Sequence, residues 1–282
     1  MIIGIIFLAN VLHLSNPAAV AMYGPVDGYG TPVTPQNHPL WDTMITMLNH
    51  EEFPVVARIT IWNEQTGAKV VWPETGLDHR DETLLAKLSW AVSFIPDNGW
   101  HNPPHDFVGF ALVEFYQKSP FGLMPLDHAN VWAWVMLGSG NFDNHSPAIE
   151  TPNCKDLPTQ SSWYFAYAIP RYDDPNHYGS DAYTTGLHIP NFGDTASEVT
   201  VRYRVGQRYA EAGQSWSFTK TVEPKHAARF DLFSELLAVG YPPNLNSEGH
   251  VEITTARPAQ LFPNAVIGTK TYLFSAAQGF CR

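Results

Sequence analysis

Positive charge is scarce in this chain of 282 residues. Lys and Arg number 16 against 27 Asp and Glu, the formal net charge is −11, and charged residues make up only 15% of the sequence. A chain with this balance is repelled by phosphate backbones and by anionic membrane surfaces. We therefore expect no nucleic-acid partner.

The sequence patterns of the common catalytic sites are absent as well. There is no G-x-S-x-G, H-E-x-x-H or C-x-x-C motif, and no glycine pattern typical of phosphate or dinucleotide binding. Carboxylates are scattered, and their spacing alone does not place two of them in one cleft. We expect a protein without catalytic activity and without catalytic residues, and a secreted hydrolase remains a third interpretation.

Only one long apolar run occurs, and it lies at the N-terminus. Residues 2–14 are almost wholly apolar, Asn16-Pro17 interrupts the run, and Ala19-Val20-Ala21 has the small-x-small pattern of a cleavage site. Residues 1–21 therefore predict a signal peptide, with an uncleaved apolar arm or anchor as the alternative. No later stretch predicts a transmembrane helix. The expected location is extracellular or on the cell surface, and the periplasm is also compatible.

Cysteine occurs only twice, at Cys154 and Cys281. In an exported protein such a pair is most often a disulfide, which here closes almost the whole second half of the chain. A disulfide that closes a loop of this length stabilises the folded protein by roughly 4–5 kcal/mol, because it lowers the entropy of the unfolded chain. We expect this bond, and two separate free thiols are the alternative.

Aromatic residues and turn formers are abundant. The chain has 9 Trp, 12 Tyr and 16 Phe, together with 23 Pro and 20 Gly. Aromatic residues favour strands, and Pro and Gly mark turns. Two segments alternate in the period of a strand with one buried face. Their apolar sets are Val55, Ala57, Ile59 and Ile61 in the first, and Val199, Val201, Tyr203 and Val205 in the second.

Three short segments of the first half resemble segments of the second half in the same order. Residues 41–49 match residues 183–191, residues 86–90 match residues 228–232, and residues 109–114 match residues 249–253. The separations are 142, 142 and 140 residues. A nearly constant separation predicts an internal duplication. The aligned positions include Asn49 with Asn191, Leu88 with Phe230, and Val113 with Ile253.

The order of strands and turns in each half resembles the immunoglobulin-like sandwiches of bacterial secreted and surface proteins. The resemblance implies an all-β fold with two tandem immunoglobulin-like antiparallel β-sandwich domains. We expect the first sandwich over residues 41–150 and the second over residues 151–282. Residues 22–40 form a Pro/Gly-rich segment without a strand pattern. We expect this segment to be either a disordered arm or an extended strand on a sheet edge of this chain or of a second copy.

Histidine is the one enrichment that suggests a ligand. The chain has 12 His, and the densest cluster holds His101 and His105 in one loop. Two imidazoles four residues apart can bind one metal ion, with His79 or His145 as a third ligand. Imidazole ligands in an exported protein favour copper or zinc. The alternative is that these are ordinary loop histidines, in which case the protein has no cofactor.

Paired tryptophans suggest a binding surface. Trp62 and Trp72 flank a predicted hairpin, where exposed aromatic rings can hold a partner, although burial in the core is the alternative. Taken together, the sequence predicts a secreted or cell-surface structural or adhesive protein that binds a protein or cell-surface partner and is able to self-associate. The alternative function is an extracytoplasmic protein that binds copper or zinc through the histidine loop.

Overall fold

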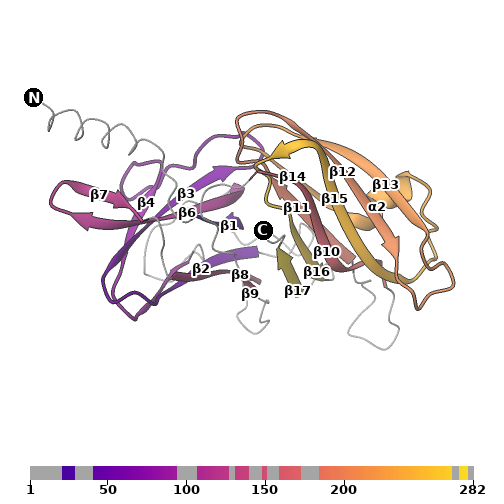
Figure 1. Cartoon of the computed structure of the whole chain (residues 1–282), viewed down its shortest axis with the longest axis horizontal. Coiled ribbons are helices and arrows are strands. Elements are labelled where there is room, and N and C mark those ends of the chain that lie inside the picture. The colour runs from indigo at the N-terminus through magenta and orange to yellow at the C-terminus, as the bar shows by residue number, and fades with distance from the viewer. Residues whose placement is uncertain are drawn as a thin grey trace, which may run out of the picture.

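The computed structural model describes residues 21–28, 41–93, 107–126, 131–139, 148–150, 159–172, 184–268 and 273–278. In these residues the protein is all-β with one short helix, and every strand pairing is antiparallel. The strands form two groups that lie side by side along the longest axis (Figure 1). The chain passes from the first group to the second between β9 and β10.

The N-terminal sandwich has two sheets that face each other. The first has the order β1-β6-β3-β4, with β7 added to β6, and the second has the order β5-β2-β8-β9. Their bounds are β1 Ala21–Gly28, β2 Trp41–Asn49, β3 Val55–Asn63, β4 Arg80–Leu84, β5 Ser89–Ser93, β6 Phe107–Ser119, β7 Gly122–Pro125, β8 Val131–Ser139 and β9 Ala148–Glu150.

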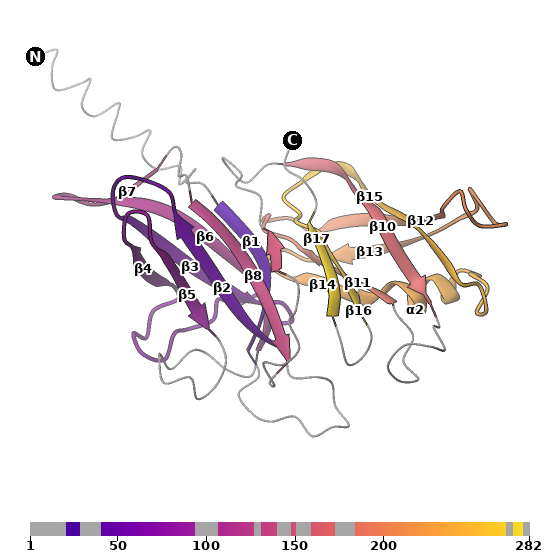
Figure 2. The same cartoon turned by 90° about the horizontal axis from the view of Figure 1, so that it is seen from below.

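The C-terminal sandwich repeats this arrangement with the orders β10-β15-β12-β13 and β14-β11-β16-β17 (Figure 2). Its elements are β10 Gln160–Arg171, β11 Thr184–Pro190, β12 Ser197–Val205, β13 Ser215–Val222, β14 Ala227–Asp231, α2 Leu232–Ala238, β15 Ser247–Ala259, β16 Asn264–Gly268 and β17 Leu273–Gln278. Each strand in the two four-strand orders of one sandwich has a counterpart at the same position in the other sandwich. Among the described residues, β7 and α2 are the elements without a counterpart.

The core of each sandwich lies between its two sheets, as the alternation predicts. Ile45 and Met47 in β2 are buried, and so are Leu187 and Ile189 in β11. The predicted register of β3 and β12 is confirmed, because their apolar sets are all at most 2% exposed. Each such aliphatic side chain contributes about 1.5–3 kcal/mol by leaving water. The first core also includes Trp72, and the second includes Leu232 and Leu236 from α2.

A buried asparagine ends β2 and closes one end of the N-terminal sandwich. The side-chain amide of Asn49 donates hydrogen bonds to the backbone carbonyls of Phe53 and Leu84, both at 3.0 Å. Its side-chain oxygen accepts from the backbone N–H of Glu51 at 2.9 Å. Buried backbone groups at the end of a strand need such partners, because water does not reach them. Asn49 therefore joins the ends of β2 and β4.

Asn191 makes the same set of bonds in the C-terminal sandwich. Its amide donates to the carbonyls of Thr195 at 2.8 Å and Val222 at 3.0 Å, and its oxygen accepts from Gly193 at 2.9 Å. Asn49 and Asn191 are both 0% exposed. The predicted alignment of these two asparagines therefore agrees with their structural environment.

The turns that lead to β5 and β14 correct one of the predicted alignments. Lys87 and Lys225 occupy these turns, and each has a φ of 59°. The next residues are Leu88 and His226, whose carbonyls accept from the backbone N–H of Asn49 at 3.0 Å and of Asn191 at 2.9 Å. Leu88 therefore corresponds to His226. The predicted match of Leu88 with Phe230, which lies in β14, is wrong.

The cause of this error is a difference in loop length. The paired residues Val55 and Leu84 are 29 positions apart in the sequence, whereas Ser197 and Val222 are 25 apart. The N-terminal sandwich thus has a longer connection between β3 and β4, and the separation of equivalent residues changes there. The third alignment holds, because Val113 pairs with Ile59 and Ile253 pairs with Val201 in equivalent strands.

The structure distinguishes between the two alternatives for the start of the segment after the apolar N-terminus. We expected either a disordered arm or an extended strand on a sheet edge, and residues 22–28 belong to β1, which pairs with β6 over eight residue pairs. The edge that this strand covers belongs to its own chain. Strand β1 is the edge strand next to β6 in the N-terminal sandwich, and β10 is the edge strand next to β15 in the C-terminal one. In each of these two sheets, the edge strand is therefore the first strand of its sandwich in the sequence. A wholly disordered arm is therefore wrong for residues 22–28.

Several predictions concern residues that the structure does not describe. These are the signal peptide up to residue 20, the remainder of the segment before residue 41, and both cysteines of the predicted disulfide, Cys154 and Cys281. Within the described ranges, no helix combines the length and the apolar character needed to cross a membrane.

Substitution of Asn191 tests the role of the buried asparagines. Asn191→Ala leaves buried backbone carbonyls without their donor, and each such group costs about 1–3 kcal/mol. We expect the free energy of unfolding in urea to fall by about 2–4 kcal/mol. The control is Ser119→Ala, because the hydroxyl of Ser119 also accepts a bond from the following backbone, from the N–H of Phe121 at 3.1 Å, but does so at the surface. The account is contradicted if the two substitutions cost the same.

Candidate functional site: the junction between the sandwiches

The two sandwiches meet through a cluster of aromatic rings. Trp62 in β3 stacks on Phe110 in β6, with ring centroids 5.7 Å apart and an interplanar angle of 15°. Phe192, from the C-terminal sandwich, meets Phe110 edge-on at 4.9 Å, and Phe262 meets Phe192 at 5.5 Å. These rings and Leu112 are buried together. Aromatic pairs of this kind contribute about 0.5–1.5 kcal/mol each beyond the burial of their area.

A charged cluster lies beside these rings. The carboxylate of Glu64 is 2.9 Å from Nε2 of His188 in β11, and it accepts from Nε and Nη2 of Arg229 in β14 at 3.0 and 3.2 Å. The side chains of Glu64 and His188 are only 8% and 6% exposed. We call Glu64, His188 and Arg229 the junction triad. It joins one residue of the N-terminal sandwich to two of the C-terminal sandwich.

Two opposing effects act on the acidity of Glu64. Burial alone would raise the pKa of its carboxyl group, because the charged form loses water. The hydrogen bonds and positive charges of His188 and Arg229 outweigh this effect, so that the pKa lies below its ordinary value of 4.5. The carboxylate of Glu64 is therefore the stable form at neutral pH.

The local chain explains how Glu64 enters the junction. The side chain of Asn63 accepts from the backbone N–H groups of Gln65 and Thr66, which turns the chain directly after Glu64. Gly67 then has a φ of 67° and lies against the ring of His226, where a Cβ atom would come within 2.6 Å of the ring. A side chain at position 67 would require the ring of His226 to shift and would be strained at this φ.

The junction was not predicted from the sequence. Glu64 lies in a turn sequence that is typical of a solvated hairpin, and it is separated from His188 by 124 residues and from Arg229 by 165. Both partners lie in strands whose alternation places them on the face opposite the core. The one available signal is a charged residue directly after a strand that ends in tryptophan and asparagine, and this pattern is too common to be specific.

The interpretation of Trp62 and Trp72 as partner-binding residues is corrected by their burial. Trp62 is 7% exposed because the C-terminal sandwich covers it, and Trp72 is 1% exposed because the hairpin after β3 folds back and inserts its ring into the core. The guanidinium of Arg80 lies 5.2 Å above the ring of Trp72. Neither ring is available to an external partner in this structure.

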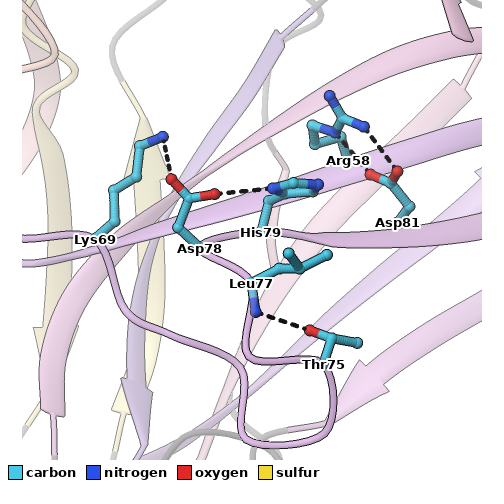
Figure 3. A network of polar contacts seen from close by, with 7 residues as sticks. All are labelled: Arg58, Lys69, Thr75, Leu77, Asp78, His79 and Asp81. Atoms are coloured by element: carbon cyan, nitrogen blue, oxygen red, sulfur yellow. Dashed lines mark hydrogen bonds and ion pairs between the residues drawn. The ribbon is translucent and has the colours of Figure 1, made fainter.

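His79 is the one residue of the predicted metal site that the structure describes. Its Nδ1 lies 2.9 Å from a carboxylate oxygen of Asp78, and Lys69 donates to the other oxygen at 2.8 Å (Figure 3). These bonds from Lys69 and His79 lower the pKa of Asp78 to about 2. Within the described ranges no group of three or more His, Cys, Asp or Glu could hold a metal ion. His101, His105 and His145 lie outside those ranges.

A second ion pair lies near this network on the outer face of the first sheet. Nε and Nη2 of Arg58 donate to the two carboxylate oxygens of Asp81 at 2.7 and 2.8 Å, as Figure 3 shows. The guanidinium also lies 5.1 Å above the ring of Tyr116. The pair is partly exposed, so it is a suitable reference for the buried junction triad.

Comparison with known proteins does not assign a family. No family model and no curated protein matches the chain. Among solved structures, protein 1070 of Thermotoga maritima is 13% identical at a TM-score of 0.30, over 44% of this chain and 96% of its own. A GH2 β-galacturonidase from Eisenbergiella tayi is 8% identical at a TM-score of 0.21, over 92% of this chain and 35% of its own. An anti-sigma factor domain-containing protein is 9% identical at a TM-score of 0.20, over 88% of this chain and 78% of its own. No functional statement follows from scores this low.

Truncation of Trp62 tests the contribution of the aromatic rings. Trp62→Ala removes a buried indole from the junction, and we expect the free energy of unfolding to fall by about 3–5 kcal/mol. The control is Phe121→Ala, because the ring of Phe121 is 97% exposed in the same sandwich. We expect this control to cost about 1 kcal/mol or less in the same urea titration. A Trp62→Ala variant as stable as the control would contradict a structural role for the ring cluster.

Proposed function

We propose that the chain is a secreted or cell-surface protein that acts as a structural or adhesive unit and has no catalytic activity. The observation that carries the proposal is the buried junction, in which the ring cluster and the junction triad join the two sandwiches. A buried junction holds the far ends of two sandwiches at a fixed spacing, which suits a protein that connects one surface to another. The apolar N-terminus and the lack of catalytic motifs point in the same direction.

We further propose that the two halves are tandem immunoglobulin-like sandwiches that arose by duplication. Three observations support this proposal. The sheets have the same strand order, Asn49 and Asn191 make the same bonds, and Lys87 and Lys225 share a positive φ in the same turn. The side chain of Lys87 also donates to the carbonyl of the residue after Asn49, and Lys225 does the same after Asn191. Shared detail at this level is difficult to obtain by chance.

The junction face is not repeated on the C-terminal sandwich. By strand position, Trp62, Phe110 and Leu112 correspond to Arg204, His250 and Glu252. A face that carries these polar groups does not bury an apolar neighbour in the same way, and terminal repeats are typically polar on their outer side. We therefore propose a unit of two sandwiches that does not add further copies through this face. Self-association by another surface remains part of the proposal.

Deletion of the gene in its native organism tests this function. We expect cells to lose attachment to surfaces several-fold while growth on each carbon source is unchanged, because the protein connects surfaces and converts no substrate. Expression of the full chain should restore attachment. The matched control is the same chain without residues 1–21, which should fail to restore attachment because it is not exported. Normal attachment together with a growth defect would contradict the proposal.

The same exported protein tests the disulfide. We propose that Cys154 and Cys281 are bonded, because they lie before the first strand and after the last strand of the same sandwich. A thiol-specific reagent should then modify neither residue unless the protein is first reduced. Modification of both without reduction would contradict the pairing.

Binding of copper or zinc is the second candidate function. The specific observation in its favour is the contact between Asp78 and Nδ1 of His79, because metal-ligating histidines commonly have their other ring nitrogen oriented by a carboxylate. In this proposal Nε2 of His79 binds the metal together with His101 and His105.

Metal analysis of the purified exported protein tests this candidate. We expect about one copper or zinc ion per chain, and loss of the ion in the His101→Ala, His105→Ala double variant. His226→Ala is the control, because the Nδ1 of His226 contacts the carbonyl of Pro224, far from this loop in the sequence. A metal-free protein whose thermal stability does not respond to added copper or zinc would remove this candidate.

A further inference from the structure

The junction triad belongs to the junction and not to the sandwich fold. The position equivalent to Glu64 in the C-terminal sandwich is Gly206, which follows β12 as Glu64 follows β3. His188 pairs with Arg229 across β11 and β14, and the corresponding pair across β2 and β5 is Thr46 with Ala91. None of the three charges is therefore needed to build a sandwich of this type. Their role must be sought in the contact between the two sandwiches.

The surroundings of Glu64 leave it dependent on two partners, the imidazole of His188 and the guanidinium of Arg229. From β11 the facing group is His188, and from β14 it is Arg229. The strand β6 and the segment before β16 contribute the rings of Phe110 and Phe262, which carry no charge. The turn before β14 contributes two further titratable groups, which are engaged elsewhere: the ring of His226 contacts the carbonyl of Pro224, and the ammonium of Lys225 pairs with Asp194.

A buried carboxylate of this kind is stable only while it is charged and paired. When it is protonated, it keeps at most part of its hydrogen bonds and loses the attraction of its charge to the guanidinium of Arg229. We propose that Glu64, His188 and Arg229 form an acid-sensitive latch that holds the two sandwiches together and releases them when the Glu64 carboxylate is protonated. Release exposes the rings of Trp62 and Phe192, so an apolar surface that is hidden at neutral pH becomes available in acid.

The direction of the pH dependence follows from the sign of the shift. The pKa of Glu64 in the closed junction is below 4.5, its value in an open and solvated state. The stabilisation that this group gives to the junction is therefore fully present above about pH 4.5, and it is lost as the pH falls through the lower pKa of the closed form. The latch holds at neutral pH and opens only in acid.

Hydrogen exchange at one amide reports the opening directly. The backbone N–H of Ala227 donates to the carbonyl of Glu64 across the junction, so its protection depends on the closed state. The amides of Asn49 and Asn191 are matched internal controls, because each is bonded in the same way inside one sandwich. Exchange is measured on the full chain between about pH 7 and about pH 3.5, after correction for the intrinsic dependence of exchange on pH.

In the unsubstituted protein, the protection of Ala227 should fall by a factor of several, and at most about tenfold, between about pH 7 and about pH 3.5, while Asn49 and Asn191 stay protected. Glu64→Gln should show the lower protection already at neutral pH and should lose the pH response. Arg229→Gln should show lower protection of Ala227 already at neutral pH and a smaller further fall in acid, because Arg229 no longer lowers the pKa of Glu64 in the closed junction. Asp81→Asn, which removes the partly exposed ion pair with Arg58, should behave like the unsubstituted protein.

Three outcomes would overturn the latch. The first is an Ala227 amide whose corrected protection does not change with pH. The second is loss of protection at Asn49 and Asn191 at the same pH as at Ala227, because acid would then unfold the sandwiches themselves. The third is a Glu64→Gln variant that keeps the pH response of the unsubstituted protein. The latch does not rest on the adhesive function, so its failure would leave the attachment experiment unaffected.

Discussion

The burial of the Glu64 carboxylate is the constraint on which the arrangement of the two sandwiches depends. Apolar rings can pack against each other in many orientations at a similar free energy, because dispersion and burial have little directionality. A carboxylate removed from water tolerates only an orientation that supplies donors and positive charge. His188 and Arg229 satisfy this requirement from neighbouring strands of one sheet. The rings therefore favour association, and the junction triad selects one geometry of association.

The molecule combines features that both sandwiches share with features that only the junction has. The shared features, such as the buried Asn49 and Asn191, close the ends of the sandwiches and concern stability. The apolar residues that the N-terminal sandwich contributes to the junction have polar residues at the equivalent positions of the C-terminal one. Two sandwiches with the same strand order therefore differ in the face that forms the junction.

The sequence was sufficient for the parts of the fold that depend on local periodicity. Alternation in residues 55–61 and 199–205 placed the correct side chains in the cores, because a strand with one buried face repeats every two residues. The match of Asn49 with Asn191 was found because no insertion lies near it. The match of Leu88 failed, since the β3–β4 connection differs in length and a constant separation cannot detect this. The strand in residues 21–28 was one of two alternatives, because its Gly and Pro residues are typical of loops.

The junction could not be predicted for a different reason. Its contacts join residues more than a hundred positions apart, and each residue has an ordinary local role: Trp62 ends a strand, Glu64 begins a turn, and Arg229 alternates along an edge. Exposure and burial of Trp62 looked equally reasonable, because the covering surface comes from the other half of the chain. Only the tertiary arrangement distinguishes a partner-binding tryptophan from one already covered by its own protein.

Small-angle X-ray scattering of the full mature chain at neutral pH tests the central claim most directly. If the ring cluster and the junction triad hold the sandwiches as one body, a single arrangement with the geometry of this structure should reproduce the scattering profile. The distribution of interatomic distances should show one maximum from distances within each sandwich and a second, distinct contribution from distances between the two sandwiches. A profile that requires an ensemble of orientations, with the flattened distribution of two sandwiches on a loose linker, would contradict the account.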